Sequence, residues 1–487
     1  MGGRIRNVTF NQALVLQQYR AFRAPTPTRL PCSKCTVLFF IQRNKKELII
    51  KKFIAFILSA LLPVIYASSV SALPVTECKL AEVSYPRSLN NHLFTGFPSL
   101  NYNMPSSGTF TIAIIPVHFS DLPGDVNPLD HLKNDMQTFV DYFNIQSTSR
   151  VRFEWKYPNQ SILIPGSYKN YFFANSTYDT IFAQMLLNSV DPYFDFTGVT
   201  TVAFVFPKDQ QFIRQGIQGF YGLTQRNKLY TNESMINNYM IHGRYFVDKP
   251  GHTVWSYWVH ELLHGFSLPD LYAHPWSPTV KNLRSEVDSY GWAPYNGWDI
   301  MASQDGPSRS LSTWTKFTLN WLDDAQVLCE KPDYFNNHKV TLVPNETIQS
   351  GIKSVIIPFS STRALVIESR RETSFNRQGP KDPVDSGVML YEIDVTRGHG
   401  EVPILPLKRR TMLFIKDATN TPPYYNALMY VGETLQYENL YIKYISESSV
   451  DEIIISNFPI VESPITKALP KNSKTKIVKK KLNHKKK

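Results

Sequence analysis

The chain has 487 residues, of which 43% are hydrophobic and 13% aromatic. It is therefore long enough for two or three domains with real cores, and too apolar to be a disordered protein. The formal net charge of +12 comes from the two ends: residues 1–72 and 467–487 each carry +10, which leaves −8 for the body. A nucleic-acid-binding protein carries its positive charge on the folded domain, so nucleic acid is excluded as the expected partner.

A removable leader is predicted for residues 1–72. Within it, basic residues precede a short apolar run over 53–67, and small residues follow up to Ala72. This order is typical of a secretory signal peptide, which we expect to span about 48–72 and to be cleaved after Ala72. An uncleaved anchor is the weaker alternative, because the apolar run is short and contains Pro63. We therefore expect a secreted or extracellular protein, with association with the cell surface left open.

The segment after the leader changes character at Gly108. Residues 73–107 are polar and contain several prolines, which predicts a pro-segment or an ordered wrap. From Gly108, strand and helix patterns alternate, with strands at 109–119, 151–155 and 200–206 and a helix at 129–143. Strands that alternate with helices predict an α/β domain, which we expect to span 108–330.

The most specific motif is His-Glu-Leu-Leu-His at 260–264. His260 and His264 lie one helical turn apart on one face, where two neutral imidazoles can bind one zinc ion. Glu261 lies beside the metal and can take a proton from a zinc-bound water. The preceding residues 253–259 are apolar and aromatic, as in a buried active-site helix. The motif predicts a peptide-hydrolysing centre; the alternative is a core helix with two polar histidines.

The longer segment HELLHGFSLPDLY, residues 260–272, resembles the active-site signature of the immune inhibitor A family of secreted metalloproteases. These proteases belong to the metzincin group, whose long motif ends in a third metal ligand. The resemblance implies that His260, His264 and Asp270 are the zinc ligands and that Glu261 is the general base. It also implies a metzincin-like protease domain with a mixed sheet and an active-site helix.

A second stretch, Gly297-Trp-Asp-Ile-Met301, is similar to the Met-turn of the same family. This similarity implies that Met301 packs beneath the metal, where its soft, apolar thioether suits imidazole rings. Asp299 within the stretch is expected to be a structural hydrogen-bond acceptor rather than a ligand. A helix with apolar spacing and an N-cap at Ser312 is predicted for 311–322.

One residue departs from the family motif. The family has glycine three residues after the second histidine, where the chain leaves the helix with a positive φ, and this chain has Ser267. Gly265 is the alternative helix breaker. A different turn would move Asp270, so Glu286 and Asp288 remain rival third ligands.

Short strands separated by turn-rich segments follow Cys329, at 339–343, 354–358, 363–368, 387–394, 440–444 and 452–456. They predict an all-β, sandwich-like domain over 331–462. The lysine-rich tail over 463–487 is predicted to be disordered, with at most a weak contact with an anionic cell envelope. Cys78 and Cys329 are the two cysteines that follow the leader, and we expect them to form one disulfide in an oxidising exterior.

Together these patterns predict a secreted zinc metalloendopeptidase with Zn²⁺ as its cofactor and proteins or peptides as its substrates. The alternative, from another functional class, is a secreted surface-binding or adhesive protein with a catalytically inactive protease-like domain. Intact His260, Glu261 and His264 favour the enzyme, whereas Ser267 keeps the alternative open.

Overall fold

The computed structural model describes the residues 73–83, 93–99, 104–170, 179–207, 228–242, 253–274, 298–304, 308–375, 386–407, 410–413 and 424–461. The predicted leader, the basic tail and the rival ligands Glu286 and Asp288 lie outside these residues. Among the described residues, no helix combines the length and the apolar character needed to cross a membrane.

The first sheet has the strand order β2-β1-β4-β7, and β3 pairs with the far end of β1. Its strands are β1 (Gly108–Phe119), β2 (Val151–Lys156), β3 (Ile162–Ile164), β4 (Val199–Val205) and β7 (Asn238–His242). Every described pairing in this sheet is parallel, which differs from the expected mixed sheet. The reason is that helical crossovers, rather than hairpins, join β1 to β2 and β3 to β4.

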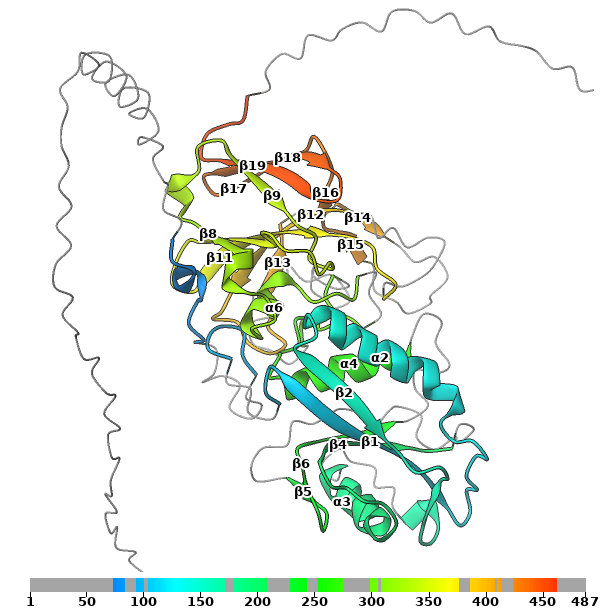
Figure 1. The fold of residues 1–487 in the computed structure, drawn as a ribbon. Coiled ribbons are helices and arrows are strands. Elements are labelled where there is room, and N and C mark those ends of the chain that lie inside the picture. The colour runs from blue at the N-terminus through cyan, green and yellow to red at the C-terminus, as the bar shows by residue number, and fades with distance from the viewer. Residues whose placement is uncertain are drawn as a thin grey trace, which may run out of the picture. The chain divides into compact units, whose positions relative to one another are not determined.

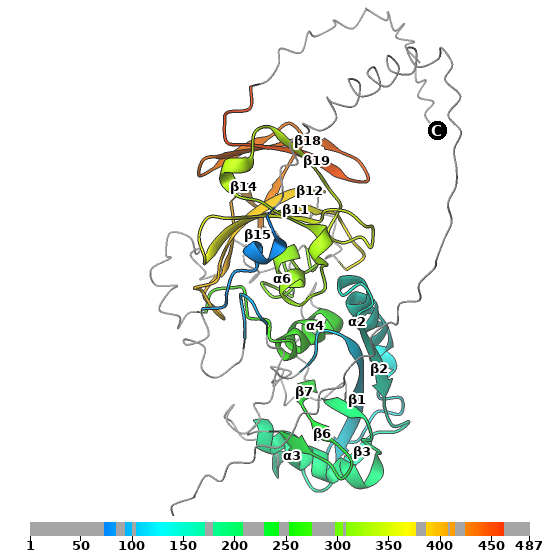
Figure 2. The same ribbon diagram turned by 60° about the vertical axis from the view of Figure 1, so that its left-hand side comes forward.

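Helices cover both faces of this sheet (Figure 1, Figure 2). The α-helices of the described residues are α2 (Lys133–Gln146), α3 (Asp179–Val190) and α4 (Val254–Gly265), which pack on this sheet, and α6 (Thr313–Thr318), which follows it in the chain. Side chains alternate along β1, so Ile112 and Ile114 belong to the buried cluster of α2 and α4, whereas Ala113 and Ile115 belong to that of α3. The crossovers through α2 and α3 run in opposite directions along the sheet, and right-handed connections then put the two helices on opposite faces.

The remaining short elements connect these layers. They are β5 (Leu229–Tyr230), β6 (Met235–Ile236) and the 3₁₀ turns η2 (Val75–Cys78), η4 (Asp130–Leu132), η5 (Tyr168–Asn170), η7 (Asp191–Tyr193), η8 (Asp324–Gln326) and η9 (Pro332–Tyr334).

Two largely antiparallel sheets follow the α/β region. The six-stranded sheet contains β8 (Val327–Cys329), β10 (Ser354–Pro358), β11 (Arg363–Arg370), β12 (Gly387–Asp394), β13 (Ile404–Pro406) and β16 (Leu428–Met429). The four-stranded sheet contains β9 (His338–Leu342), β17 (Thr434–Tyr437), β18 (Leu440–Glu447) and β19 (Asp451–Ser456), and β14 (Arg410–Leu413) pairs with β15 (Tyr424–Asn426). Both larger sheets contribute to one buried cluster, for example Leu365 and Ile367 with Ile442 and Ile453, as in sheets packed face to face.

The six-stranded sheet is buried on its second face as well. Val366 and Met389 project there into the same hydrophobic cluster as α4 and α6. The β sheets and the α/β region therefore share a continuous core on either side of residue 330.

Helix α6 is shorter than the predicted helix over 311–322. Ser312 is its N-cap, as predicted, and its side chain accepts a hydrogen bond from the backbone N–H of Thr315. The helix ends at Thr318, however, because Asn320 adopts a positive φ of 56° and turns the chain. Asparagine tolerates this conformation, so the apolar spacing beyond it is not helical.

The described part of residues 73–99 packs against this shared core. Cys78 forms a disulfide with Cys329, the last residue of β8. The backbone N–H of Leu73 donates to the Cys329 carbonyl at 3.1 Å, and the Trp314 indole N–H donates to the Thr95 carbonyl at 2.8 Å. These contacts hold the described part of the segment against the core, and the choice between a pro-segment and a wrap stays a prediction.

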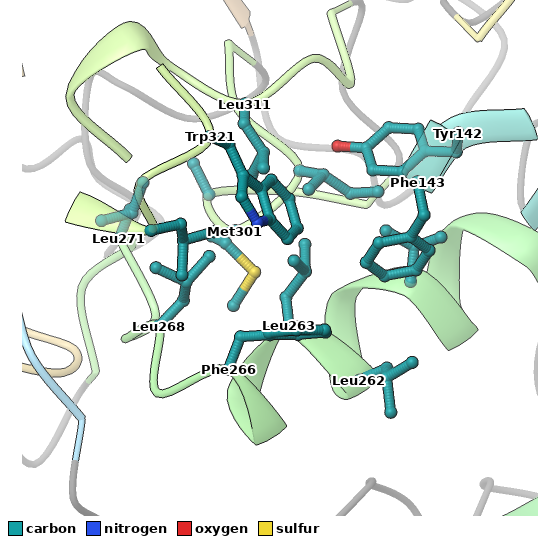
Figure 3. Packing of buried hydrophobic residues seen from close by; sticks show 14 of the residues in the cluster. Tyr142, Phe143, Leu262, Leu263, Phe266, Leu268, Leu271, Met301, Leu311 and Trp321 are labelled. Atoms are coloured by element: carbon teal, nitrogen blue, oxygen red, sulfur yellow. The ribbon is translucent and has the colours of Figure 1, made fainter. Parts of the chain in front are cut away.

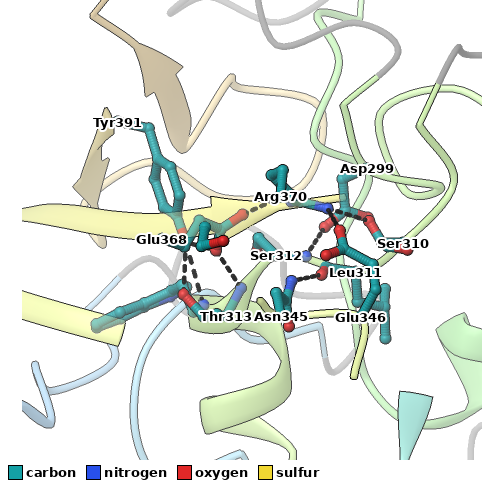
Figure 4. A network of polar contacts seen from close by, with 12 residues as sticks. Asp299, Ser310, Leu311, Ser312, Thr313, Asn345, Glu346, Glu368, Arg370 and Tyr391 are labelled. Carbon is teal, nitrogen blue, oxygen red and sulfur yellow. Dashed lines mark hydrogen bonds and ion pairs between the residues drawn. The ribbon is translucent and has the colours of Figure 1, made fainter. Parts of the chain in front are cut away.

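A buried ion network joins strand β11 to the segment that begins α6 (Figure 4). The Arg370 guanidinium contacts the carboxylates of Glu368 and Glu346, and it donates to the Ser310 carbonyl at 3.1 Å. The Glu368 carboxylate also accepts a hydrogen bond from the backbone N–H of Thr313 at 2.6 Å. Because buried charges are tolerated only when paired, this network fixes β11 against the start of α6.

Replacement of Arg370 tests the importance of this network. Arg370→Met is expected to lower the free energy of unfolding by about 3–5 kcal/mol, because two buried carboxylates lose their cation. Arg363 on the same strand is a matched control: it pairs with Glu392, but its side chain is 41% exposed. Arg363→Met should cost at most about 1 kcal/mol. Urea unfolding followed by tryptophan fluorescence measures both variants, and equal losses would contradict the assignment.

Candidate metal centre

Helix α4 carries the motif on a buried, aromatic-rich helix. At its start, the backbone N–H of Trp255 donates to the Asp135 carboxylate at 3.0 Å. An acceptor at this place satisfies an otherwise unpaired donor and complements the positive end of the helix dipole. Trp258 and Leu262 are buried in the shared core, and His260 is only 3% exposed. The helix therefore holds its histidines rigidly.

Backbone carbonyl groups fix the orientation of the two motif histidines. Nδ1 of His260 lies 2.8 Å from the Ile300 carbonyl, and Nδ1 of His264 lies 2.8 Å from the Leu268 carbonyl. A carbonyl only accepts, so each Nδ1 carries its proton. In its neutral form, each ring then presents the Nε2 lone pair on the opposite side, as metal-binding histidines do.

Both Nε2 atoms face one oxygen of Asp270. Oδ1 of Asp270 lies 3.1 Å from Nε2 of His260 and 3.4 Å from Nε2 of His264. Bonds of about 2.0–2.1 Å at a tetrahedral angle place ligand atoms about 3.3 Å apart, so these separations suit a shared metal ion. The three residues form a group that could hold a metal, and Oδ1 is buried without a hydrogen-bond partner in the described structure. A proton or a metal ion between these atoms would offset the buried negative charge of Asp270.

The charges of these groups are strongly coupled. Burial lowers the pKa of His260, but the nearby Asp270 carboxylate outweighs it and raises that pKa to about 9. Burial raises the pKa of Asp270, but the surrounding histidines outweigh it and hold that pKa well below its usual range. Asp270 is therefore an anion that stabilises positive charge at the two imidazoles.

Ser267 makes the turn that brings Asp270 to the histidines. It adopts a positive φ of 69°, the conformation that glycine has in the family motif. Its N–H donates to the His264 carbonyl at 2.9 Å, and the N–H of Leu268 donates to the Leu263 carbonyl at 3.2 Å. These two bonds are the Schellman pattern of a helix C-terminus. The turn therefore forms without glycine at this position.

Gly265 is not the helix breaker, contrary to the alternative raised above. It is the last residue of α4 and does not have a positive φ. A Cβ atom at this position would lie 3.0 Å from Oδ1 of Asn238 and 3.1 Å from Sδ of Met104. The glycine allows close packing at the end of the helix.

Met301 is fully buried next to the segment that carries Asp270. Its side chain lies among Leu263, Leu268 and Trp321 (Figure 3). The backbone N–H of Leu271 donates to the Met301 carbonyl at 3.0 Å, so this turn also positions the residue after Asp270. The role of Met301 beneath a metal stays a prediction.

Asp299 stabilises the same turn. Its Oδ1 accepts from the N–H of Met301 at 2.8 Å and its Oδ2 from the N–H of Ser312 at 2.7 Å. Burial raises the pKa of Asp299 to about 6, against the lowering effect of these two donors. Asp299 is thus the structural acceptor expected from the sequence.

Glu261 is half-buried and lies on α4 between the two histidines. Burial raises the pKa of Glu261, while the charges of His260 and His264 lower it and Asp270 raises it further. Tyr257, one turn earlier, lowers the pKa of Glu261.

Sequence reasoning missed two further histidines. Oδ2 of Asp270 lies 2.9 Å from Nε2 of His274 and 3.5 Å from Nε2 of His399. His274 follows Asp270 by four residues, which is a usable signal for proximity. His399 has no such signal, because it comes from the loop between β12 and β13, 129 residues further on.

Comparisons with known proteins give distant likenesses among solved structures alone. No family model and no curated protein matches the chain. Among solved structures, the chain is similar to catalytic inactive OgpA from Akkermansia muciniphila, crystallised in complex with an O-glycopeptide substrate, glycodrosocin. The TM-score is 0.27 at 12% sequence identity, over 60% of this chain and 85% of that chain. At this distance the functional argument rests on the site itself.

Alanine variants of the acidic candidates test the third ligand. Asp270→Ala is expected to weaken zinc binding by more than the roughly 10- to 100-fold typical of an outer hydrogen-bond partner. Glu286→Ala and Asp288→Ala should bind zinc like the wild type. Titration against a chromophoric chelator measures all three. Normal zinc binding by Asp270→Ala, with a loss in either other variant, would transfer the ligand role to that acid.

Ser267→Gly tests the cost of the serine turn. Relief of the positive φ favours glycine, while the greater freedom of the unfolded chain disfavours it, so we expect a gain of up to about 1 kcal/mol. Asn320 is a matched control, because it occupies the corresponding position after α6, with N–H bonds from Asn320 to Phe317 and from Trp321 to Lys316. Asn320→Gly should not be stabilising, since asparagine already suits this conformation. Denaturant unfolding measures the free energy of unfolding of both variants. A lower value for Ser267→Gly than for the wild type would contradict the expected strain at Ser267.

Proposed function

We propose that this protein is a secreted zinc-dependent endopeptidase. The observation that carries the proposal is the convergence of three side chains. Oδ1 of Asp270 lies 3.1 Å from Nε2 of His260 and 3.4 Å from Nε2 of His264. Glu261 lies between the two histidines on the same helix. The proposed zinc ligands are these three side chains, and the proposed general base is Glu261.

The donor set supports zinc over other common metals. Two imidazole nitrogens and one carboxylate oxygen are three protein ligands, the number that catalytic zinc sites use while keeping one position for water or substrate. Magnesium and calcium prefer sites made of oxygen ligands. When bound, zinc supplies Lewis acidity, which lowers the pKa of water and polarises a carbonyl group.

Glu261 supplies the proton transfer. Its carboxylate takes a proton from the attacking water and returns it to the nitrogen of the leaving amine. Partial burial suits this role, because burial raises the pKa of Glu261 towards the working pH. The carbonyl partners of His260 and His264 keep both rings in one tautomer throughout.

The alternative of an inactive, adhesive protein has lost its main support. That alternative rested on Ser267, whose side chain threatened the turn before Asp270. Ser267 adopts the required positive φ of 69°, and Oδ1 of Asp270 lies 3.1 Å from Nε2 of His260. The ligand geometry therefore favours an active centre.

The proposal includes the organisation of the chain. We propose a leader over 1–72 that ends at Ala72, a metalloprotease domain over 108–330 and a sandwich-like β domain over 331–462. The Cys78–Cys329 disulfide supports an oxidising, extracellular setting. Protein or peptide substrates follow from the proposed chemistry.

Glu261→Gln separates the chemistry from metal binding. The variant should retain zinc, because all three ligands remain, and should lose the roughly 10²- to 10⁴-fold that general base catalysis contributes. The measurement is zinc content together with casein hydrolysis, with and without a zinc chelator. Near wild-type hydrolysis by Glu261→Gln, or wild-type hydrolysis that survives the chelator, would refute the mechanism.

A further inference from the structure

Asp270 uses its two oxygens for different tasks. Oδ1 faces the two motif histidines, whereas Oδ2 faces a second pair, His274 at 2.9 Å and His399 at 3.5 Å. The side chains of the second pair are only 13% and 14% exposed, so solvent competes weakly for this carboxylate. The outer oxygen is therefore as enclosed as the inner one.

Two backbone hydrogen bonds join the loop that carries His399 to the segment from Asp270 to His274. The N–H of Gly400 donates to the Asp270 carbonyl at 3.0 Å, and the N–H of His274 donates to the Gly400 carbonyl at 2.9 Å. Gly400 has a φ of +69°, and a Cβ atom there would lie 2.3 Å from the His274 ring. Only glycine fits at this place while His274 faces Asp270.

A second metal ion is the obvious alternative, because Asp270, His274 and His399 also form a group of potential ligands. The protonation of His399 argues against it. The backbone N–H of Asp270 donates to Nδ1 of His399 at 3.0 Å, so Nδ1 is the acceptor and the neutral ring carries its proton on Nε2. That Nε2 points at Oδ2 of Asp270, and a protonated nitrogen cannot bind a metal.

We propose that His274 and His399 are positioning residues that hold the outer oxygen of Asp270 by N–H donation, so that its inner oxygen is fixed for the metal. The proposal rests on the proposed zinc site. It makes the loop between β12 and β13 a part of that site. Outer donors of this kind orient a ligand carboxylate and keep it anionic.

The test uses asparagine and glutamine at each histidine. Glutamine places an amide nitrogen near the position of Nε2 and keeps the donor, whereas asparagine reproduces only the Nδ1 position. The expected result is a loss of zinc affinity of about 10- to 100-fold in His274→Asn and His399→Asn, with substantial recovery in both glutamine variants. A purely structural role for His399, through its bond to the Asp270 N–H, predicts the reverse order and would overturn the proposal.

Controls separate this inference from the proposed function. His338, a half-buried histidine of β9, is the matched control, and His338→Asn should leave zinc affinity unchanged. Wild-type affinity in His260→Ala would refute the zinc site itself. Loss in His260→Ala, with wild-type affinity in both asparagine variants, would refute only the positioning role. Two zinc ions per chain, one of them lost in His274→Asn, would favour the second metal site instead.

Gly400→Ala is the second route if an asparagine variant fails to fold. It keeps both histidines, but its added methyl group must displace the His274 ring. A loss of zinc affinity of at least about tenfold is expected from the displaced donor. Unchanged affinity in the folded Gly400→Ala variant would overturn the proposal.

Discussion

The site depends on a carboxylate that is buried and still charged. Asp270 is 4% exposed, and removal of such an anion from water is costly unless the protein compensates it. Two imidazoles face each oxygen: His274 and His399 at the outer one, and His260 and His264 at the inner one, where a bound cation would offset the charge. They come from helix α4, from the segment after it and from a distant loop. The position of Asp270 therefore requires three parts of the chain to fold together.

The end of helix α4 shows how this position is reached with an unfavourable residue. Serine resists a positive φ, yet the Schellman bonds after His264 form, and the N–H of Phe94 donates to the Ser267 carbonyl at 2.9 Å. Phe94 belongs to the described segment 93–99, more than 170 residues earlier in the chain. A contact between distant residues thus supports a turn that local preference alone would not select.

The sequence predicts those parts of the molecule that short-range patterns determine. Strand β1 and helix α4 follow from apolar periodicity, and the contact of Asp270 with His260 is what the family resemblance implies. The end of α6 was missed because Asn320 stops a helix whose apolar spacing continues. The parallel character of the first sheet depends on strand order, which spacing does not reveal. The proximity of His399 to Asp270 could not be predicted, because only the fold brings the two segments together.

The six-stranded sheet connects the contacts around Asp270 with the rest of the core. One of its faces packs on the four-stranded sheet, and the other shares a cluster with α4 and α6. The ion network around Arg370 fixes β11 to the segment before α6, where Asp299 accepts from Ser312 and supports the turn of Met301. The loop after β12 reaches Asp270 directly. Two routes thus connect the sheet to the proposed ligands, one to His260 through the Ile300 carbonyl and one to Asp270 through His399. The proposed metal site is therefore held from both sides, and its geometry does not rely on the short helix alone.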